Sequence, residues 1–598
     1  MGRKNRGWLF ALGAAALAVA LAFALRFLSV PGRQDSSPPP PGATAPRRGG
    51  ELVVAIRSDP PTFNRYANAQ LADNTVEAIT HLLHAKLARI DRQTGELVPW
   101  LAERWTESAD HLTYTVTLRD GVKWSDGHPF TADDVRFSFE AAYDARLNSS
   151  LRSSMLVRGK PLAVSAPDAR TVVLAFPSPF GPGLRILDNM VIFPRHRLEA
   201  SLRAGTMGEA WGPSANPAEI AGLGPFRLVS YTPAERIVFE RNPHYFRHVA
   251  RGTSHVARDA SHVARDALPY LDRLTLVVVR DQSTEVLRLL GGQVDISARE
   301  IRPEDYATLR REESQGRVAL ADAGTGLDPN MLWFNLSPPA FRGDPRKPWL
   351  QSETFRKAIS HAVDRKALVD QVYLGAGVPI DGPVTPGNKE WYVEDLPRYE
   401  LDRSRARELL AGLGLTDRNG DGMLEDAAGR AVRFSILTQQ QDTIRMRTAS
   451  VLQEQLRQSG IAVDVVGVDP GSIVQRWAAS DYDAIYFGVE ASSHDPANNL
   501  DFWLSSGSFH VWNAGQKSPA TEWEARIDAL IEQQISTTDG EERRRLYAEV
   551  QRIFAEHLPI LYFAAPRLIV AMTPRVANAR PAPLKPLVLW SADTLAVK

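Results

Sequence analysis

The sequence predicts an α/β fold that is divided into two or three folding units. At 598 residues the chain is too long for a single hydrophobic core. Between Tyr270 and Val466, short apolar runs typical of strands alternate with helical patterns, which favours sheets that are partly parallel. The third observation is a dense unit of strand, two turns and helix start at residues 102–135.

The strand, turn and helix-cap signals agree with one another along the whole of residues 102–135. Threonines alternate with apolar residues from Thr113 to Leu118, which predicts a half-buried strand. Asp120-Gly121 and Asp126-Gly127 predict turns on either side of Trp124. Thr131 stands at the N-cap position of the helix that follows, with two aspartates in its first turn.

The remaining elements follow from the same two periodicities. They are a strand from Glu51, a helix at Asn74–Ala88, two strands joined by a turn in AGLGPFRLVSY and RIVFERNPHYF, a strand-helix-strand unit at 270–296, a strand at Met331–Asn335, an amphipathic helix at Thr354–Val372, a helix at Arg403–Leu413, a strand at Arg433–Leu437, a helix at Ile444–Ser459 and a strand at Ala462–Val466.

Two motifs together resemble the family 5 extracellular solute-binding proteins, the oligopeptide- and dipeptide-binding receptors of ABC importers. They are the unit at 102–135 and the Gly-x-Gly-Pro-Phe turn at 222–226, which precedes a strand and Arg241-Asn242-Pro243. The resemblance covers about residues 51–570. It implies a periplasmic-binding-protein-like fold of type II, in the large peptide-binding subclass, with two lobes, a hinge and an extra inserted domain. It also implies no enzymatic reaction and no cofactor.

The resemblance divides the chain into segments. Lobe I would comprise residues 49–80, 190–322 and 556–598, the inserted small domain 81–189 and lobe II 323–555, with hinge crossings near Ala321 and Phe554. HVAR occurs three times, at His248, His255 and His262, and the unit SHVARDA is repeated in tandem, which departs from the family pattern. We expect this insertion at 248–267 to expand an exposed turn, with a metal-binding array or a heptad helix as alternatives.

The N-terminus predicts export. Arg3, Lys4 and Arg6 precede an apolar run at residues 8–25, and a Pro-rich tether completes the segment 1–48. The run is long enough to be a membrane anchor as well as a cleaved signal, so both interpretations stay open. Either one places the folded part in the periplasm or, more generally, outside the cytoplasmic membrane.

Composition excludes several functions. Lys plus Arg equals Asp plus Glu at 70 each, so no basic face for nucleic acid is expected. The absence of cysteine excludes disulfides, thiolate metal sites and cysteine catalysis. Ser360, His361 and Asp364 are the residue types of a hydrolase triad, but their spacing on one helix directs Ser and His to different faces.

A calcium loop is a weak candidate for a metal site. Asp417, Asn419, Asp421 and Glu425 match positions 1, 3, 5 and 9 of such a loop, whereas position 12 is Ala428. The alternative is a turn rich in Asx and Gly. No other metal site is predicted.

The ligand-binding candidates come from the resemblance of segment 481–513 to the stretch that lines the family's cleft, and from an upstream loop. Ser492 occupies the position at which peptide-binding members place an aspartate for the ligand ammonium, so Glu490 or Asp495 would have to substitute. Asp481-Tyr482-Asp483 are further ligand-facing candidates. The full set of predicted contacts is Trp391, Tyr392, Glu490, Ser492, His494, Asp495, Trp512 and Asn513.

These observations predict the substrate-binding protein of an ABC importer. It would capture di- or oligopeptides outside the cytoplasmic membrane and deliver them to permease subunits. The alternative is a membrane-tethered sensor or chaperone-like module that uses the fold to bind a partner protein or a non-peptide solute.

Overall fold

The computed structural model describes residues 48–67, 74–147, 149–248, 268–488 and 495–598. The predicted signal or anchor at 8–25, the tandem SHVARDA repeat, and Glu490, Ser492 and His494 lie outside these ranges. Within them, no helix combines the length and the hydropathy that crossing a membrane requires.

The first lobe is built on an eight-stranded mixed sheet in the order β12-β19-β11-β1-β10-β9-β8, with β14 pairing to β19. β1 runs parallel to β10 and β11, and β19 runs antiparallel to β11 and β12. The strands are β1 (Glu51–Ile56), β8 (Phe226–Thr232), β9 (Arg236–Arg241), β10 (Arg273–Val278), β11 (Ile296–Ser297), β12 (Ala319–Thr325), β14 (Gly377–Pro379) and β19 (Ala564–Met572), and the helices are α2 (Asn74–Leu83), α5 (Arg195–Ala204), α6 (Gln282–Leu290) and α7 (Pro303–Ser314).

A four-stranded antiparallel sheet, β4-β5-β7-β6, packs beside the first sheet and shares its core, which contains both Leu52 and Val116. The expected strand at Thr113–Leu118 is confirmed, and so is the cap of the next helix, because Thr131 and Asp134 form a capping box. The elements here are β2 (Ala88–Ile90), β3 (Leu97–Pro99), β4 (Ala102–Glu107), β5 (Thr113–Leu118), α3 (Ala132–Tyr143), α4 (Ser150–Ser154), β6 (Ala163–Asp168) and β7 (Thr171–Ala175).

The second lobe is built on a five-stranded sheet in the order β16-β15-β17-β13-β18. Its three strands β15, β16 and β17 are parallel, and each face of the sheet covers a separate core. The elements are β13 (Asn330–Phe334), α8 (Lys347–Leu350), α9 (Glu353–Ala362), α10 (Arg365–Val372), α11 (Arg403–Gly412), β15 (Arg433–Gln439), α12 (Thr443–Arg457), β16 (Ala462–Val468), α13 (Pro470–Ala478), β17 (Ala484–Gly488), α14 (Leu500–Trp503), α15 (Glu522–Ser536), α16 (Gly540–His557) and β18 (Ile560–Tyr562); the chain ends with β20 (Val576–Ala577) and β21 (Ala596–Val597) beside the first lobe.

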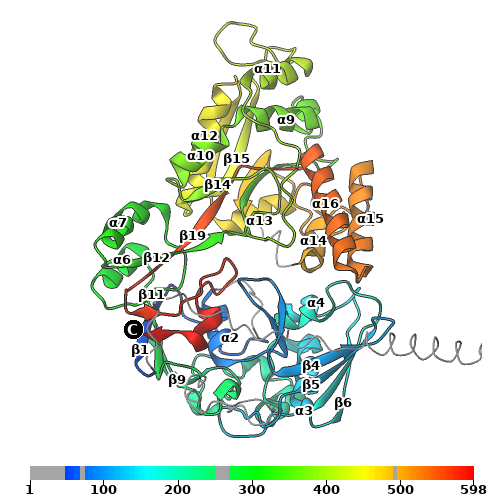
Figure 1. The fold of residues 1–598 in the computed structure, drawn as a ribbon. Coiled ribbons are helices and arrows are strands. Elements are labelled where there is room, and N and C mark those ends of the chain that lie inside the picture. Colours follow the sequence, from blue (N-terminus) through cyan, green and yellow to red (C-terminus); the bar gives the residue numbers. More distant parts are fainter. Residues whose placement is uncertain (1–47, 68–73, 148, 249–267, 489–494) are drawn as a thin grey trace, which may run out of the picture.

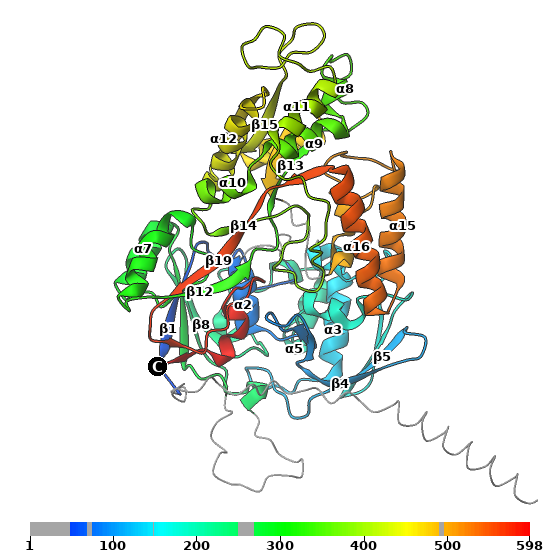
Figure 2. The same cartoon turned by 45° about the horizontal axis from the view of Figure 1, so that its top comes forward.

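Apart from β14, which lies between β13 and β15 in the chain and pairs with the first residues of β19, the chain passes twice between the two sheets. It leaves β12 at Thr325 and enters β13 at Asn330, and it returns at Phe563, between β18 and β19. These crossings lie later in the sequence than Ala321 and Phe554, because β12 stays paired with β19 as far as Thr325 and α16 continues to His557. Figures 1 and 2 show β12 and β19 rising from the first lobe toward the second.

The prediction of one helix at Thr354–Val372 was wrong. The structure has two helices, α9 and α10, which are separated at Val363 and Asp364. Asp364 has an extended backbone, and its side chain accepts a hydrogen bond from the N–H of Ala367 at 2.8 Å. An apolar pattern alone does not reveal such a cap inside a helical periodicity.

Candidate functional site

The carboxyl ends of both sheets point toward the space between the lobes. β12 runs in the same direction as β1, so Thr325 lies at the carboxyl edge of the first sheet. β13 is antiparallel to β17 and begins at Asn330, which pairs with Gly488 at the carboxyl edge of the second sheet. Both crossings therefore join one carboxyl edge to the other. In open α/β sheets, ligands bind beyond the carboxyl ends of the strands.

The lobes also touch at the end remote from the crossings. The Gly181 N–H donates to the Ile535 carbonyl at 2.7 Å, and Ile535 packs into the core of the first lobe. Arg158 pairs with Glu532 at 3.2 Å, and Arg185 pairs with Glu390 at 2.9 Å. Burial raises the pKa of Glu390, while Arg185 acts in the opposite direction. The space between the carboxyl edges is thus bounded on two sides by contacts between the lobes.

Asp495 is fully engaged in an ion pair. Its two carboxylate oxygens accept hydrogen bonds from Arg543 at 2.6 and 2.9 Å, and one also accepts from the Ala497 N–H. Both side chains are almost completely buried. Removing one partner from such a pair leaves an uncompensated buried charge. Asp495 therefore fixes the chain after residue 494 onto α16, and this carboxylate is not available to a ligand ammonium in this structure.

Trp391 packs against the arginine of the Asp495–Arg543 ion pair. The Arg543 guanidinium lies 5.1 Å from its ring centroid, and Tyr547 meets the ring edge to face. Its neighbour Tyr392 is 37% exposed. Of these two adjacent candidates, only Tyr392 presents its side chain to solvent.

Trp512 lies within the core of the second lobe, where it is 1% exposed and packs against Phe502 and Phe554. Its indole N–H donates to Glu524 at 3.1 Å. Burial would raise the pKa of Glu524, but hydrogen bonds from His510 and Trp512 lower it to about 2. Asn513 is buried and donates to the Gln516 side chain. Both residues have structural partners, and their roles as ligand contacts stay predictions.

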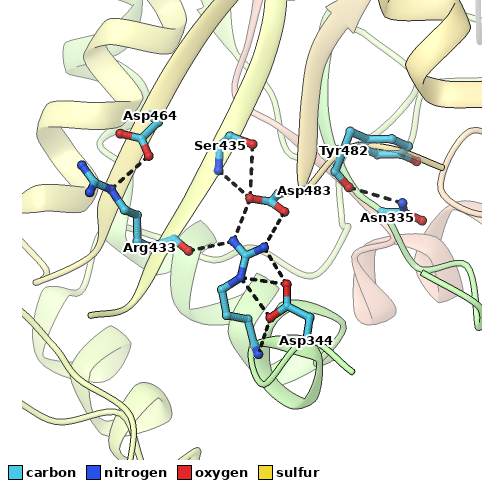
Figure 3. A network of polar contacts seen from close by, with 8 residues as sticks. Asn335, Asp344, Arg433, Ser435, Asp464, Tyr482 and Asp483 are labelled. Carbon is cyan, nitrogen blue, oxygen red and sulfur yellow. Dashed lines mark hydrogen bonds and ion pairs between the residues drawn. The ribbon is translucent and has the colours of Figure 1, made fainter. Parts of the chain in front are cut away.

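Asp481, Tyr482 and Asp483 lie at the opposite edge of the second sheet, because they precede β17 rather than follow it. Figure 3 shows Asp483 between Ser435 and the loop that carries Asp344. The Arg346 guanidinium bridges the two aspartates, with Nη1 2.9 Å from Asp483 and Nη2 2.7 Å from Asp344. This network fastens residues 344–346 to the sheet and engages Asp483 with protein groups. A ligand-facing role for Asp481, Tyr482 and Asp483 stays a prediction.

The calcium candidate folds as an exposed loop between α11 and β15. Carboxylate oxygens of Asp417, Asp421 and Glu425 lie within 4.8 Å of one another. Asp417 accepts from the N–H groups of Gly420 and Gly422, and the Asn419 amide donates to Asp421 and Glu425. These hydrogen bonds close the loop with protein groups alone. Calcium binding stays a prediction.

Arg445, in the first turn of α12, is a cationic side chain at the carboxyl edge of the second sheet. Its Nε donates to Asn330 Oδ1 at 2.8 Å, Nη1 donates to Gln439 Oε1, and the guanidinium stacks 4.0 Å above the Phe487 ring. Sequence reasoning missed this residue, because an arginine on an amphipathic helix carries no sign of which end of the sheet it reaches.

Comparison with known proteins places this fold in a family. Residues 96–510 match the bacterial extracellular solute-binding proteins, family 5. The chain is 26% identical over 502 residues to a probable ABC transporter-binding protein of Deinococcus radiodurans, covering 81% of this chain and 82% of the relative. It is 25% identical over 540 residues to the oligopeptide-binding protein AppA of Bacillus subtilis, covering 89% of each chain.

The fold is also similar to solved structures. The substrate-binding protein CtaP of Listeria monocytogenes aligns with a TM-score of 0.74 at 23% identity, over 92% of this chain and 100% of that one.

The chain belongs to the family 5 extracellular solute-binding proteins. It is an extracytoplasmic protein that binds a small solute and works with an ABC transporter. Proteins of this family bind and do not catalyse, so the expectation that the chain is no enzyme is confirmed.

Proposed function

We propose that the protein captures di- or oligopeptides between the two carboxyl edges and presents them to the permease of an ABC importer. The topology carries this proposal, since both interlobe crossings join the carboxyl edges and a solute held there contacts both lobes. Ligand contacts to both lobes favour the closed state, the hinge closure for which periplasmic binding proteins are a standard example.

Peptide cargo is supported by the relatives. Besides AppA, the chain is 25% identical to a probable D,D-dipeptide-binding periplasmic protein and to a dipeptide-binding protein, both of Escherichia coli. Other proteins of similar fold are described in complex with Ni(L-His), agropinic acid or stachyose. The engagement of Asp495 by Arg543 favours a ligand that needs no carboxylate at that position.

A thermal-shift screen tests the proposal, because a solute that binds only the folded state raises the melting temperature. The purified protein is screened against peptides of two to eight residues, neutral sugars and metal chelates. A ligand of micromolar affinity, about 8 kcal/mol of binding free energy, is expected among the peptides. If only sugars or chelates raise the melting temperature, the proposed peptide ligand is wrong but solute capture stands. If no class of compound raises it, the result counts against solute capture itself.

A further inference from the structure

A cavity lies inside the first lobe, between the end of α2 and the helical turn at Leu589–Thr594. None of the residues that line it belongs to the second lobe. The cavity volume is about 20 Å³, and roughly 10–15 Å³ is enough to hold one water. There is therefore room for one water molecule or one small ion. The polar part of the wall includes His84, Lys86, Arg89, Tyr245 and Asp593.

Two side chains of this wall carry polar atoms without a hydrogen-bond partner among the described residues. They are His84, at both ring nitrogens, and Arg89, at Nε. A neutral imidazole has one N–H, and a guanidinium has N–H groups only, so each of the two side chains offers a donor. A buried donor that finds no acceptor lowers the stability of the fold. An acceptor inside the cavity would remove this cost at both positions.

Positive charge is in excess beside the cavity. Lys86 and Arg92 share one carboxylate, that of Asp188, at 3.3 and 2.8 Å. Burial lowers the pKa of Lys86, whereas Asp188 acts in the opposite direction. The carboxylate of the wall itself, Asp593, is engaged by Arg247, whose Nη1 donates to Oδ2 at 2.6 Å. The two carboxylates are thus occupied by three cations before Arg89 is considered.

Arg89 has no carboxylate within 4.0 Å among the described residues. Its guanidinium lies 3.3 Å from the centroid of the Trp100 ring, and Nη1 donates to the Trp590 carbonyl at 3.2 Å. Burial lowers the pKa of Arg89, and the more distant charge of Asp593 offsets this only in part. A cation that is removed from water without a close anionic partner is costly. The cavity lies beside this cation.

We propose that the cavity binds a monovalent anion of the size of chloride, which accepts hydrogen bonds from Arg89 and His84. A water molecule could accept the same hydrogen bonds, but only an anion also offsets the excess positive charge. Such an anion would stabilise the first lobe, with Lys86 on the same wall. The inference goes beyond the proposed function and does not depend on which solute the protein captures.

Bromide tests the site in the wild type, because it can replace chloride and scatters X-rays anomalously. Crystals of the protein soaked in sodium bromide are expected to show an anomalous peak in the cavity, within hydrogen-bonding distance of Arg89 Nε. A cavity that is empty, or that holds only a water molecule without anomalous signal, would overturn the proposal. This readout needs no variant, so it stands even if substitutions at the site prevent folding.

Thermal unfolding measures the effect of the anion on stability. Chloride is exchanged for gluconate at constant ionic strength, so that screening of surface charges stays the same. The melting temperature should rise with chloride concentration and reach a plateau about 2 °C higher, as for a ligand that binds only the folded state. Equal melting temperatures in chloride and in gluconate would contradict the site.

Arg89→Gln removes the cation that has no carboxylate partner, and should abolish the chloride response. The matched control is Arg104→Gln in β4, where a 61% exposed arginine lies 3.7 Å from Glu103; it should keep the full response. A chloride response of wild-type size in Arg89→Gln would overturn the assignment of the anion to this cavity. Loss of the response in both variants would do the same, because it would show an effect of net charge rather than of a site.

Discussion

At the scale of single residues, burial decides the charge of His84. The imidazole is 4% exposed and lies between Phe193 and Trp211, at centroid distances of 4.9 and 6.1 Å. Within the described residues neither ring nitrogen has a side-chain or backbone partner at hydrogen-bonding distance. Burial lowers the pKa of His84 to about 4. His84 is therefore a neutral core residue at neutral pH.

This burial predicts a pH-dependent stability. The unfolded chain binds a proton on His84 near pH 6.5 and the folded chain only near pH 4, so stability falls as the pH drops from about 6.5 to about 4. The free energy of unfolding falls by about 3 kcal/mol in total, because each unit of pKa shift corresponds to about 1.4 kcal/mol. His84→Phe should lack this part of the acid sensitivity. Melting temperatures of both proteins at pH 7 and pH 4.5 measure the difference, and an equal acid-induced loss in both would contradict it.

At the scale of elements, the break between α9 and α10 depends on the Asp364 cap. Asp364→Ala leaves the N–H of Ala367 without its side-chain acceptor, which costs about 1 kcal/mol. The cost should appear locally, as faster amide exchange in the first turn of α10. Asp370→Ala in the same helix removes an exposed pairing with Lys366 and is the matched control, with a smaller effect. Unchanged exchange in Asp364→Ala would mean that packing alone stops α9.

Elements with a clear period could be predicted from the sequence. The strand at 113–118 has the expected bounds, and α11, α12, β15 and β16 agree with the expected elements to within about two residues. The turns, caps and apolar faces of these elements depend only on residues that are close in the sequence, so they can be recognised without knowledge of the tertiary structure. The prediction of one continuous helix at Thr354–Val372 failed because a single cap residue, Asp364, overrides a continuous apolar pattern.

The candidate site was harder to predict, because its groups come from segments far apart in the sequence. Arg543 approaches Asp495 from 48 residues away and Arg445 approaches Asn330 from 115 residues away. A motif shows which residue types are available, whereas the edge of the sheet at which they lie depends on strand direction. For this reason the sequence did not reveal that Asp481, Tyr482 and Asp483 precede β17 and so lie a full strand length from Gly488, at its carboxyl end.

At the scale of the whole molecule, closure depends on how closely the lobes approach at Gly181. A Cβ at this position would lie 2.4 Å from the Thr537 carbonyl oxygen and 2.5 Å from Arg543 Nε. Contacts this short require the backbone to move at Thr537, directly after α15, or at residue 181 itself. The pairs Arg158–Glu532 and Arg185–Glu390 flank the same approach. Glycine at 181 is thus a condition for the observed contact between the lobes, far from the crossings.

Gly181→Ala is therefore expected to favour a more open arrangement and to weaken ligand binding without changing any residue at the carboxyl edges. The chain has no cysteine, so spin labels can be placed at Glu140→Cys in α3 and Glu522→Cys in α15, both exposed. Electron–electron distance measurements should give a longer and broader distribution in Gly181→Ala, and ligand should shift it back only in part, because it must offset the clash. Gly412→Ala in α11, where an added Cβ meets nothing within 4 Å, is the control. Identical distance distributions and affinities in the wild type and Gly181→Ala would show that the lobes close without this contact, and would place the control of closure at the two crossings alone.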